Sequence, residues 1–260
     1  MMASSRHVDH RCSVHGYYTE AEPDAALRRH IARVWIHRLP CAPEPSVLVV
    51  PDGCIDLLWI DGNLSVAGAD RAARRQTLAP GGVVVGLRFQ PGAARHWLRL
   101  PATDIVGQQI ALDDIWGADA RRLADDAGAA LDPEDIARRL QCGLQRRATG
   151  IAADDRDMRM LFARLSYPHD SALCPVSAAA TLLDVSPRTL RRRSHDAFGY
   201  GPKTLERILR FQRFLATAGD AHGLADCAAA VGYADQAHLS REVKRLSSLP
   251  PTEVLDHIAG

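Results

Sequence analysis

A run of arginines is the part of this sequence whose residue types suit an anionic partner. The stretch DVSPRTLRRRSHDAFG, residues 184–199, holds Arg191, Arg192 and Arg193 in succession, after a Ser-Pro pair typical of a helix start. Guanidinium groups donate paired hydrogen bonds to phosphates and to the edge of guanine. A solvated helix face is the plain alternative. The formal net charge of the 260-residue chain is only +1, so any attraction to nucleic acid must come from a local patch.

A faint internal duplication surrounds this run. Ala180 and Asp184 stand in a first copy where Ala228 and Gly232 stand in a second, 48 residues later. Each copy has the pattern of a short Ala-rich helix, a turn and a second helix. A small Ala lets two helices approach closely, and Asp or Gly can adopt the left-handed conformation that a sharp inter-helix turn requires. The pattern therefore predicts two helix-turn-helix units.

Helical angles divide the side chains of the two second helices into a buried and an exposed set. At about 100° per residue, with Leu190 and Leu239 as the buried directions, Arg193 points back towards the protein, and we expect Asp184 or Asp196 to be its partner. Between residues 187 and 213 there are eight basic residues against two acidic ones, which favours an anionic partner over a solvated face. The outward-facing and flanking residues are Arg188, Thr189, Arg191, Arg192, Gln236, Ala237, Ser240, Arg241 and Lys244.

Over about residues 170–255 the sequence resembles the arabinose-regulator (AraC/XylS) family of bacterial transcription regulators. The resemblance is carried by VSAAATLLDVSPRTLRRRSHDAFGYGPKTLERILRFQRFLA and, more specifically, by GYADQAHLSREVKRL followed by Pro-Pro-Thr-Glu. It implies two helix-turn-helix units joined by a linker helix at about 202–217, with both recognition helices in successive major-groove segments about 34 Å apart. Three positions where the family usually has phenylalanine, and one where it usually has glycine, differ here: Ser194, Leu239 and Val243, and Ser248.

The resemblance and the angles together imply a role for each outward-facing side chain. Bidentate contacts to guanine are expected from three arginines: Arg188, Arg192 and Arg241. Gln236 is expected to pair with adenine and Ala237 to contact a thymine methyl group, while Thr189 suits a base or a phosphate. Phosphate contacts, which position the protein without specifying sequence, are expected from Arg191, Ser240 and Lys244.

A second resemblance covers about residues 15–117. The pieces VPDGCIDLLW, GLRFQPGAARHWL and ALDDIWG look like an N-terminal domain found in one branch of such regulators. In the wider family this domain is often a cupin-like β-barrel that binds a small effector and dimerises. No His-x-His cupin metal signature is present, so we expect no metal and no cofactor. The partners implied are double-stranded operator DNA, an unidentified small effector, RNA polymerase and a second copy of the chain; a regulator that needs no ligand is the alternative.

Other residues with reactive side chains have simpler explanations. Cys54 lies between Asp52 and Asp56, whose carboxylates raise the pKa of a neighbouring thiol, so a packed cysteine is favoured over a sensing thiol. Trp59 and Trp97 could line an effector pocket, but packing in the hydrophobic core is the favoured interpretation for both. A stripe on the helix expected at 133–148 suits a dimer seam or packing on its own domain: Ile136, Leu140 and Leu144. An N-terminal run has the types and spacing of zinc or copper ligands, although such runs are more often incidental: His7, His10, Cys12 and His15.

We expect no enzyme, since the sequence contains no Ser-His-Asp, GxGxxG or P-loop pattern and His96 has no evident partner. A lyase- or isomerase-like β-barrel fused to a DNA-binding tail is the alternative. Six scattered cysteines without CxxC spacing, the lack of an apolar leader and the lack of a long apolar run indicate a cytoplasmic, nucleoid-associated protein with no membrane contact.

The elements that must position these residues change in character along the chain. Strands are expected at 46–50, 54–60, 64–68 and 82–89, with Asp61-Gly62-Asn63 as a hairpin turn. Helices are expected at 93–100, 113–128 and 133–148, then throughout 157–257 after a hinge at 149–156. The fold class is therefore α+β in two domains: a mobile terminus at 1–15, a β-barrel-like domain with a helical extension at 16–150, and an all-α domain at 157–260.

Overall fold

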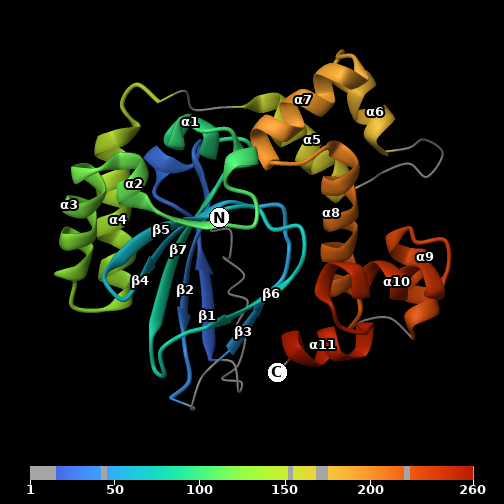
Figure 1. Ribbon diagram of the computed structural model, residues 1–260, viewed down its shortest axis with the longest axis horizontal. Coiled ribbons are helices and arrows are strands. Elements are labelled where there is room, and N and C mark those ends of the chain that lie inside the picture. Colours follow the sequence, from blue (N-terminus) through green and yellow to red (C-terminus); the bar gives the residue numbers. More distant parts are fainter. Residues whose placement is uncertain (1–15, 42–45, 152–154, 168–174, 220–222, 260) are drawn as a thin grey trace, which may run out of the picture.

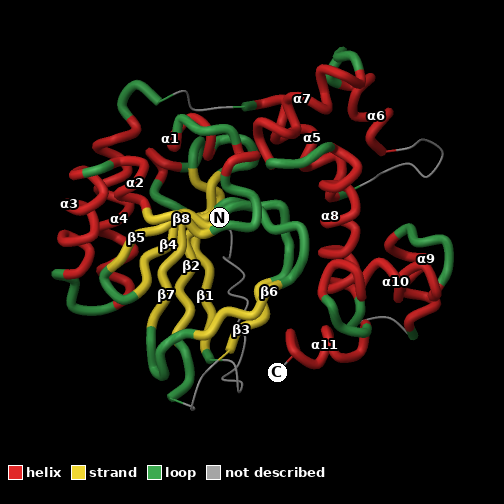
Figure 2. Tube along the Cα trace, in the orientation of Figure 1, coloured by secondary structure: helices red, strands yellow, loops and turns green. Residues whose placement is uncertain are grey.

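The computed structural model describes residues 16–41, 46–151, 155–167, 175–219 and 223–259. Its N-terminal part is built around antiparallel strands, and its C-terminal part consists of helices (Figures 1 and 2). The His7, His10, Cys12 and His15 run lies outside the described residues. The α+β organisation expected from the sequence is confirmed.

In the residues that the structure describes, eight strands form two separate sheets. The larger sheet has the order β1 (Tyr17–Ala21), β2 (Ile31–Arg38), β7 (Val83–Phe89), β4 (Asp56–Ile60), β5 (Asn63–Ala67) and β8 (Gln109–Ala111), and the smaller pairs β3 (Ser46–Val49) with β6 (Arg74–Thr77). The barrel-like domain is thus an arrangement of two open sheets, without closure into a barrel. The predicted hairpin is confirmed as β4–β5, and its turn residues Asp61 and Gly62 have φ values of 47° and 82°, as a two-residue hairpin turn requires.

Helices of the N-terminal part pack on the larger sheet. They are α1 (Ala94–Leu98), α2 (Leu112–Trp116), α3 (Ala118–Gly128) and α4 (Pro133–Ala148), with 3-10 turns η1 (Ala25–Leu27) and η2 (Ala102–Asp104). The prediction of a single helix at 113–128 is wrong, because Gly117 at φ 58° separates α2 from α3. The stripe Ile136, Leu140 and Leu144 is buried inside the chain, where α4 packs against β2 and β7. That stripe is therefore no dimer seam.

The C-terminal part follows the predicted duplication. Its helices are α5 (Arg156–Ser166), α6 (Pro175–Leu182), α7 (Pro187–Phe198), α8 (Pro202–Thr217), α9 (Leu224–Val231), α10 (Gln236–Ser247) and α11 (Pro251–Ala259). The linker helix expected at 202–217 is confirmed as α8, with α7 near one end and α10 near the other (Figure 1). No helix in the described part of the chain is long and apolar enough to span a membrane.

One continuous core joins the two parts. The buried apolar residues form a single cluster that includes both strand residues such as Leu57 and helix residues such as Phe211. Gly199, just after α7, lies so close to η2 that a Cβ there would stand 2.8 Å from the carbonyl oxygen of Ala102. The C-terminal helices are thus docked tightly against the β-rich part.

Candidate DNA-binding surface and interdomain cavity

The first helix-turn-helix unit consists of α6 and α7. Asp184 in its turn has φ 49°, the left-handed conformation expected from the sequence. Ser186 caps α7, since its hydroxyl accepts a hydrogen bond from the amide of Thr189 at 3.1 Å, and Pro187 begins the helix. Leu190 is buried, which fixes the rotation of the helix and turns the opposite face outwards.

The second unit, α9 and α10, repeats this arrangement. Gly232 has φ 83° in the turn, and the carboxylate of Asp235 caps α10 by accepting from the amide of His238 at 2.6 Å. Leu239, Val243 and Leu246 form the buried stripe of α10. Two units of the same construction therefore present one helix each to solvent.

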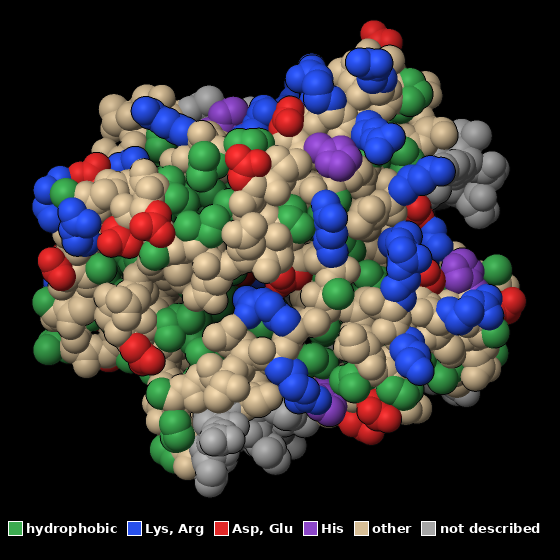
Figure 3. Space-filling view, viewed as in Figure 1, with side chains coloured by type: hydrophobic (Ala, Val, Ile, Leu, Met, Phe, Trp, Pro, Cys, Tyr) green, Lys and Arg blue, Asp and Glu red, His purple; other side chains and the backbone are tan. Residues whose placement is uncertain are grey.

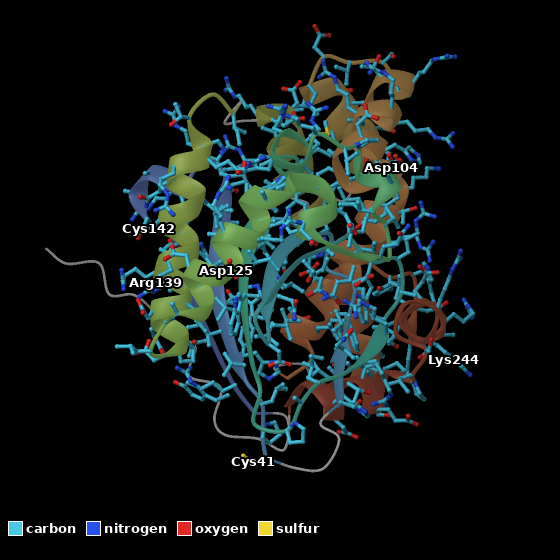
Figure 4. All side chains as sticks on the ribbon, turned by 60° about the vertical axis from the view of Figure 1, so that its left-hand side comes forward. Cys41, Asp104, Asp125, Arg139, Cys142 and Lys244 are labelled. Carbon is cyan, nitrogen blue, oxygen red and sulfur yellow. The ribbon has the colours of Figure 1, made fainter. Side chains whose placement is uncertain are left out.

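The nine residues predicted to face DNA all lie on these two helices. Seven are exposed: Arg188, Arg191, Arg192, Gln236, Ala237, Arg241 and Lys244. Lys244 extends from α10 away from the rest of the protein (Figure 4). Thr189 and Ser240 are half-buried, and their hydroxyls contact Ser186 Oγ at 3.0 Å and the carbonyl of Gln236 at 2.9 Å. The contacts of these nine residues with bases or phosphates stay predictions.

Arg193 points back into the protein as expected, but its partner is different. It forms an ion pair with Asp157 in the first turn of α5 rather than with Asp184 or Asp196. Asp196 lies instead 3.9 Å from Arg192, one helical turn away. Both expected partners lie on α7 or in the turn before it, whereas the packing of α5 against α7 brings the Asp157 carboxylate to Arg193.

The eight basic residues between 187 and 213 divide into four that are exposed and four that bind groups within the protein. Arg207 pairs with Glu242 at 2.6 Å and Arg210 with Glu206, while Arg213 donates to the carbonyl of Leu165 at 2.6 Å. With Arg193, four of the eight basic residues between 187 and 213 are thus engaged within the protein. The exposed ones are Arg188, Arg191, Arg192 and Lys203. Figure 3 shows Lys and Arg side chains spread over this helical part.

The residues that differ from the family pattern are accommodated. Ser194 is fully buried, and its hydroxyl donates to the carbonyl of Tyr200 at 2.7 Å, so its polar group is satisfied. Leu239 and Val243 are fully buried. Ser248 is the C-cap of α10 and has φ 64°, a conformation that favours glycine.

Replacing Ser248 by glycine is expected to stabilise the protein. The Ser248→Gly substitution removes the Cβ that is strained at positive φ, which should raise the free energy of unfolding by about 1 kcal/mol and the Tm by about 2–4 °C. The matched control is Ser247→Gly, one residue earlier, where the hydroxyl donates to Val243 at 2.7 Å and the backbone is helical. That variant should be less stable than the parent. Thermal unfolding of the two variants measures the difference, and a Ser248→Gly protein no more stable than the parent contradicts the prediction.

A cavity of about 740 Å³ lies between the two sheets and is bordered by α8. Its walls come from the larger sheet, including Tyr18 and Trp35, from β3 and β6, and from Gln212 and Leu215 of α8. Trp97 instead packs in the core against Phe89 and Trp116. Trp59 is absent from the described lining and packs against the core. The aromatic residues of the cavity are therefore ones that sequence patterns did not single out.

A partly buried ion-pair group lines the cavity. The Arg88 guanidinium lies 2.8 Å from Asp52 and 3.1 Å from Asp56. Burial, and then the Asp52 carboxylate, raises the pKa of the Cys54 thiol well above its usual value. Cys54 is thus a packed, protonated cysteine rather than a reactive thiolate.

The segment that connects the cavity to both recognition helices is short. We call residues 68–77, which lead from β5 through β6, the β5–β6 segment. Its Ala73 amide donates to the carbonyl of Leu246 near the end of α10 at 2.6 Å, and its Arg71 donates to the carbonyl of Gly199 at the end of α7 at 3.0 Å. Asp70 and Arg74 of the same segment line the cavity. One segment therefore contacts the C-terminal ends of both helices and the cavity.

No group of three or more His, Cys, Asp or Glu side chains within the described ranges is arranged to hold a metal ion. The cavity and the two outward-facing helices are the features that remain as candidate sites.

Two known families match different parts of the chain. Residues 19–111 match a domain of unknown function, DUF6597, and residues 179–257 match a family described as a helix-turn-helix domain. No relative was found among curated proteins.

Solved structures with a similar fold include those of ToxT from Vibrio cholerae. ToxT of strain O395 is 10% identical, covers 86% of this chain and 97% of its own, and has a TM-score of 0.48. The same protein bound to (E)-4-(8-methylnaphthalen-1-yl)but-3-enoic acid is 9% identical over 86% and 97% of the two chains, with a TM-score of 0.45. ToxT bound to an unsaturated fatty acid is 10% identical over 85% and 90%, with a TM-score of 0.43. The chain carries an AraC-type helix-turn-helix domain at its C-terminus, preceded by a DUF6597 domain.

Proposed function

We propose that the protein regulates transcription by binding operator DNA with α7 and α10, under the control of a small effector held in the cavity. The observation that carries the proposal is the pair of capped helices whose N-terminal turns are exposed, since these turns meet base edges in helix-turn-helix proteins. The two hydrogen bonds that the β5–β6 segment donates to these helices in the described residues lie at their opposite, C-terminal ends. A linker of 16 residues, about 24 Å long at 1.5 Å per residue, suits two helices that enter the groove about one DNA turn apart.

Each of the nine side chains predicted to face DNA has a proposed role in this complex. Arg188, Arg192 and Arg241 are the candidates for guanine, Gln236 for adenine and Ala237 for a thymine methyl group. The phosphate contacts fall to Arg191, Ser240 and Lys244. Thr189 is a candidate for contact with a phosphate or a base, and its hydroxyl already contacts that of Ser186. We propose 16–150 as the effector domain and 157–260 as the DNA-binding domain.

Selection of bound DNA from a random pool, using the full chain, tests this proposal. The expected product has two short preferred sequences whose centres are about one helical turn apart. A pool that emerges with a single short site, or with no preference, would overturn the proposal of two reading helices.

Removing the Arg192 side chain is expected to change base preference. Arg192→Ala should lose about 1–3 kcal/mol of discrimination at one position in one half of the site. The matched control is its neighbour: Arg191→Ala should weaken binding to all sequences alike and lower the salt dependence by about one counterion. Binding measured against a set of single-base operator variants separates the two patterns. Uniform weakening by Arg192→Ala would make that residue a phosphate contact.

The effector part of the proposal rests on the place of the cavity. Gln212 of α8 lines it and donates to the carbonyl of Pro51 at 2.8 Å, so a ligand there touches the helix that links the two DNA-binding units. The β5–β6 segment gives a second route to both recognition helices. We assign the protein no enzymatic role, and turnover of a bound compound would contradict that assignment.

The remaining partners follow from the proposed activity. A regulator of this kind acts on the chromosome in the cytoplasm and contacts RNA polymerase. A homodimer has to use a surface other than the buried Ile136, Leu140 and Leu144 stripe.

A further inference from the structure

The cavity between the two sheets is charged at one end and apolar at the other. Asp56 of β4 pairs in register with Arg88 of β7, and four residues further along the same strands Ile60 pairs with Val84. All four residues line the cavity, and β3 adds the apolar side chains of residues 47–49. A ligand that fills this space must therefore have a polar group at one end and an apolar body.

Carboxylates outnumber guanidinium groups at the charged end. Among the described residues, the charged side chains of the lining are Asp52, Asp56, Asp70, Arg74 and Arg88. Arg88 is engaged by both Asp52 and Asp56, and Arg74 lies 3.5 Å from Asp70. Burial raises the pKa of both Asp56 and Asp70, so a cation bound beside them would favour their charged forms. With all five groups ionised, three carboxylates against two guanidinium groups leave one negative charge in excess on the described lining.

Two aromatic rings stand beside one of these carboxylates, that of Asp56. The ring centroids of Tyr18 and Trp35 are 5.7 Å apart at an interplanar angle of 33°. Burial raises the pKa of Asp56 while the indole N–H of Trp35 lowers it, and this buried N–H makes no hydrogen bond within the described residues. Burial raises the pKa of Tyr18, so that this ring stays neutral. Aromatic faces next to an excess carboxylate attract a desolvated cation.

We propose that the cavity binds an amphiphilic organic cation, with its ammonium or amidinium group near Asp56 and Asp70 beside Tyr18 and Trp35, and its apolar body along Ile60 and Val84. The role of this ligand as the effector rests on the proposed function. An anionic ligand is disfavoured, because it would bring a further negative charge to three carboxylates and would compete with them for Arg74 and Arg88.

Three probes with the same eight-carbon chain test the ligand class on the full-length protein: octyltrimethylammonium, 1-octanol and octanoate. At saturation, octyltrimethylammonium is expected to raise the Tm by about 3 °C or more, 1-octanol by less, and octanoate not at all. A Tm increase with octanoate that equals or exceeds that with octyltrimethylammonium overturns the proposal. Equal increases with all three probes also overturn it, because charge would then have no influence.

A charge variant locates the head group. Asp70→Asn keeps the shape of the side chain and leaves the Arg88 group intact, and it is expected to weaken octyltrimethylammonium binding about tenfold or more while 1-octanol binding is unchanged. The matched control is Asp114→Asn, an equal charge change at an exposed position of α2 outside the cavity lining. Unchanged affinity of Asp70→Asn for octyltrimethylammonium overturns the placement of the head, and the probe series on the unaltered chain needs no variant to fold.

Operator affinity measured with and without each probe separates this inference from the proposed function. Octyltrimethylammonium that binds without changing DNA affinity supports the ligand class and overturns the effector role. Octanoate that binds and changes DNA affinity supports the effector role and overturns the ligand class.

Discussion

Arg88→Ala is expected to destabilise the protein by about 3–5 kcal/mol near pH 7, because it leaves the largely buried Asp56, and the half-buried Asp52 beside it, without their common cation. The exposed fractions of the Arg88 and Asp56 side chains are only 24% and 14%, so water replaces little of the lost interaction. With about 2–4 °C per kcal/mol for a chain of this size, the Tm should fall by about 10 °C. Thermal or urea unfolding measures the loss.

The same variant should show a characteristic pH dependence. Burial already raises the pKa of Asp56 in the native state, and Arg88 opposes that rise, so removing Arg88 raises the pKa further. A carboxyl group whose folded pKa lies above its unfolded pKa loses stabilising free energy as the pH rises through the folded value. The penalty of Arg88→Ala should therefore be smaller at pH 5 than at pH 8.

An exposed arginine supplies the control for this prediction. Arg121→Ala removes a guanidinium that is 64% exposed and 3.7 Å from Asp113, and should change stability by less than about 1 kcal/mol at either pH. If Arg88→Ala and Arg121→Ala proved equally mild, the Arg88 group would not be a stabilising centre of the cavity wall.

Gly199→Ala is expected to destabilise the protein by about 2–4 kcal/mol. The residue has φ 77°, where a Cβ costs about 1–2 kcal/mol. The new methyl group would also lie 1.8 Å from Val106 Cγ2 and 2.8 Å from the carbonyl oxygen of Ala102, so the contact between α7 and η2 must open. Thermal unfolding measures the total loss.

Gly232 provides a matched comparison, because it has a similar φ of 83° but no atom within 4 Å of a Cβ. Gly232→Ala should therefore show only the backbone part, about 1–2 kcal/mol. The difference between the two variants isolates the close approach of α7 to the β-rich part. Equal losses at Gly199 and Gly232 would mean that this approach contributes nothing to stability.

Most helical elements were predictable because each helix carries its own signals, although the break between α2 and α3 at Gly117 was missed. Pro202 at the start of α8 and the Asp132-Pro133 pair at the start of α4 fix boundaries that the sequence alone locates correctly. The outward faces of α7 and α10 were predictable for the same reason: the positions of Leu190 and Leu239 set the rotation of their own helices. Which bases or phosphates these faces contact stays a prediction.

Several strands were not predictable, because their stability comes from distant partners. The sequence of β6, Arg-Arg-Gln-Thr, has no apolar residue and forms a strand only by pairing with β3. β8 has only three residues and pairs with β5. Gln109 of β8 donates a hydrogen bond to the hydroxyl of Ser65 in β5, which is 44 residues earlier in the sequence. Neither segment has the alternation that identifies a strand locally.

The cavity could not be predicted from the sequence for a related reason. Its walls come from strands and from α8, which only long-range pairing and docking bring together. Arg193 illustrates the same limit on a smaller scale, since its partner Asp157 is 36 residues away on another helix. Angles within one helix give the direction of a side chain, but not the group that it meets.

The contacts of Arg71 and Ala73 with the ends of α7 and α10 also bear on operator architecture. Inserting one base pair between two half-sites moves them about 3.4 Å apart and rotates them by about a tenth of a turn. Two reading helices tied to the same short segment cannot follow that rotation independently. While the segment holds both helices, the protein should bind operators with one spacing between the half-sites only. Release of the segment would allow it to bind half-sites at several spacings.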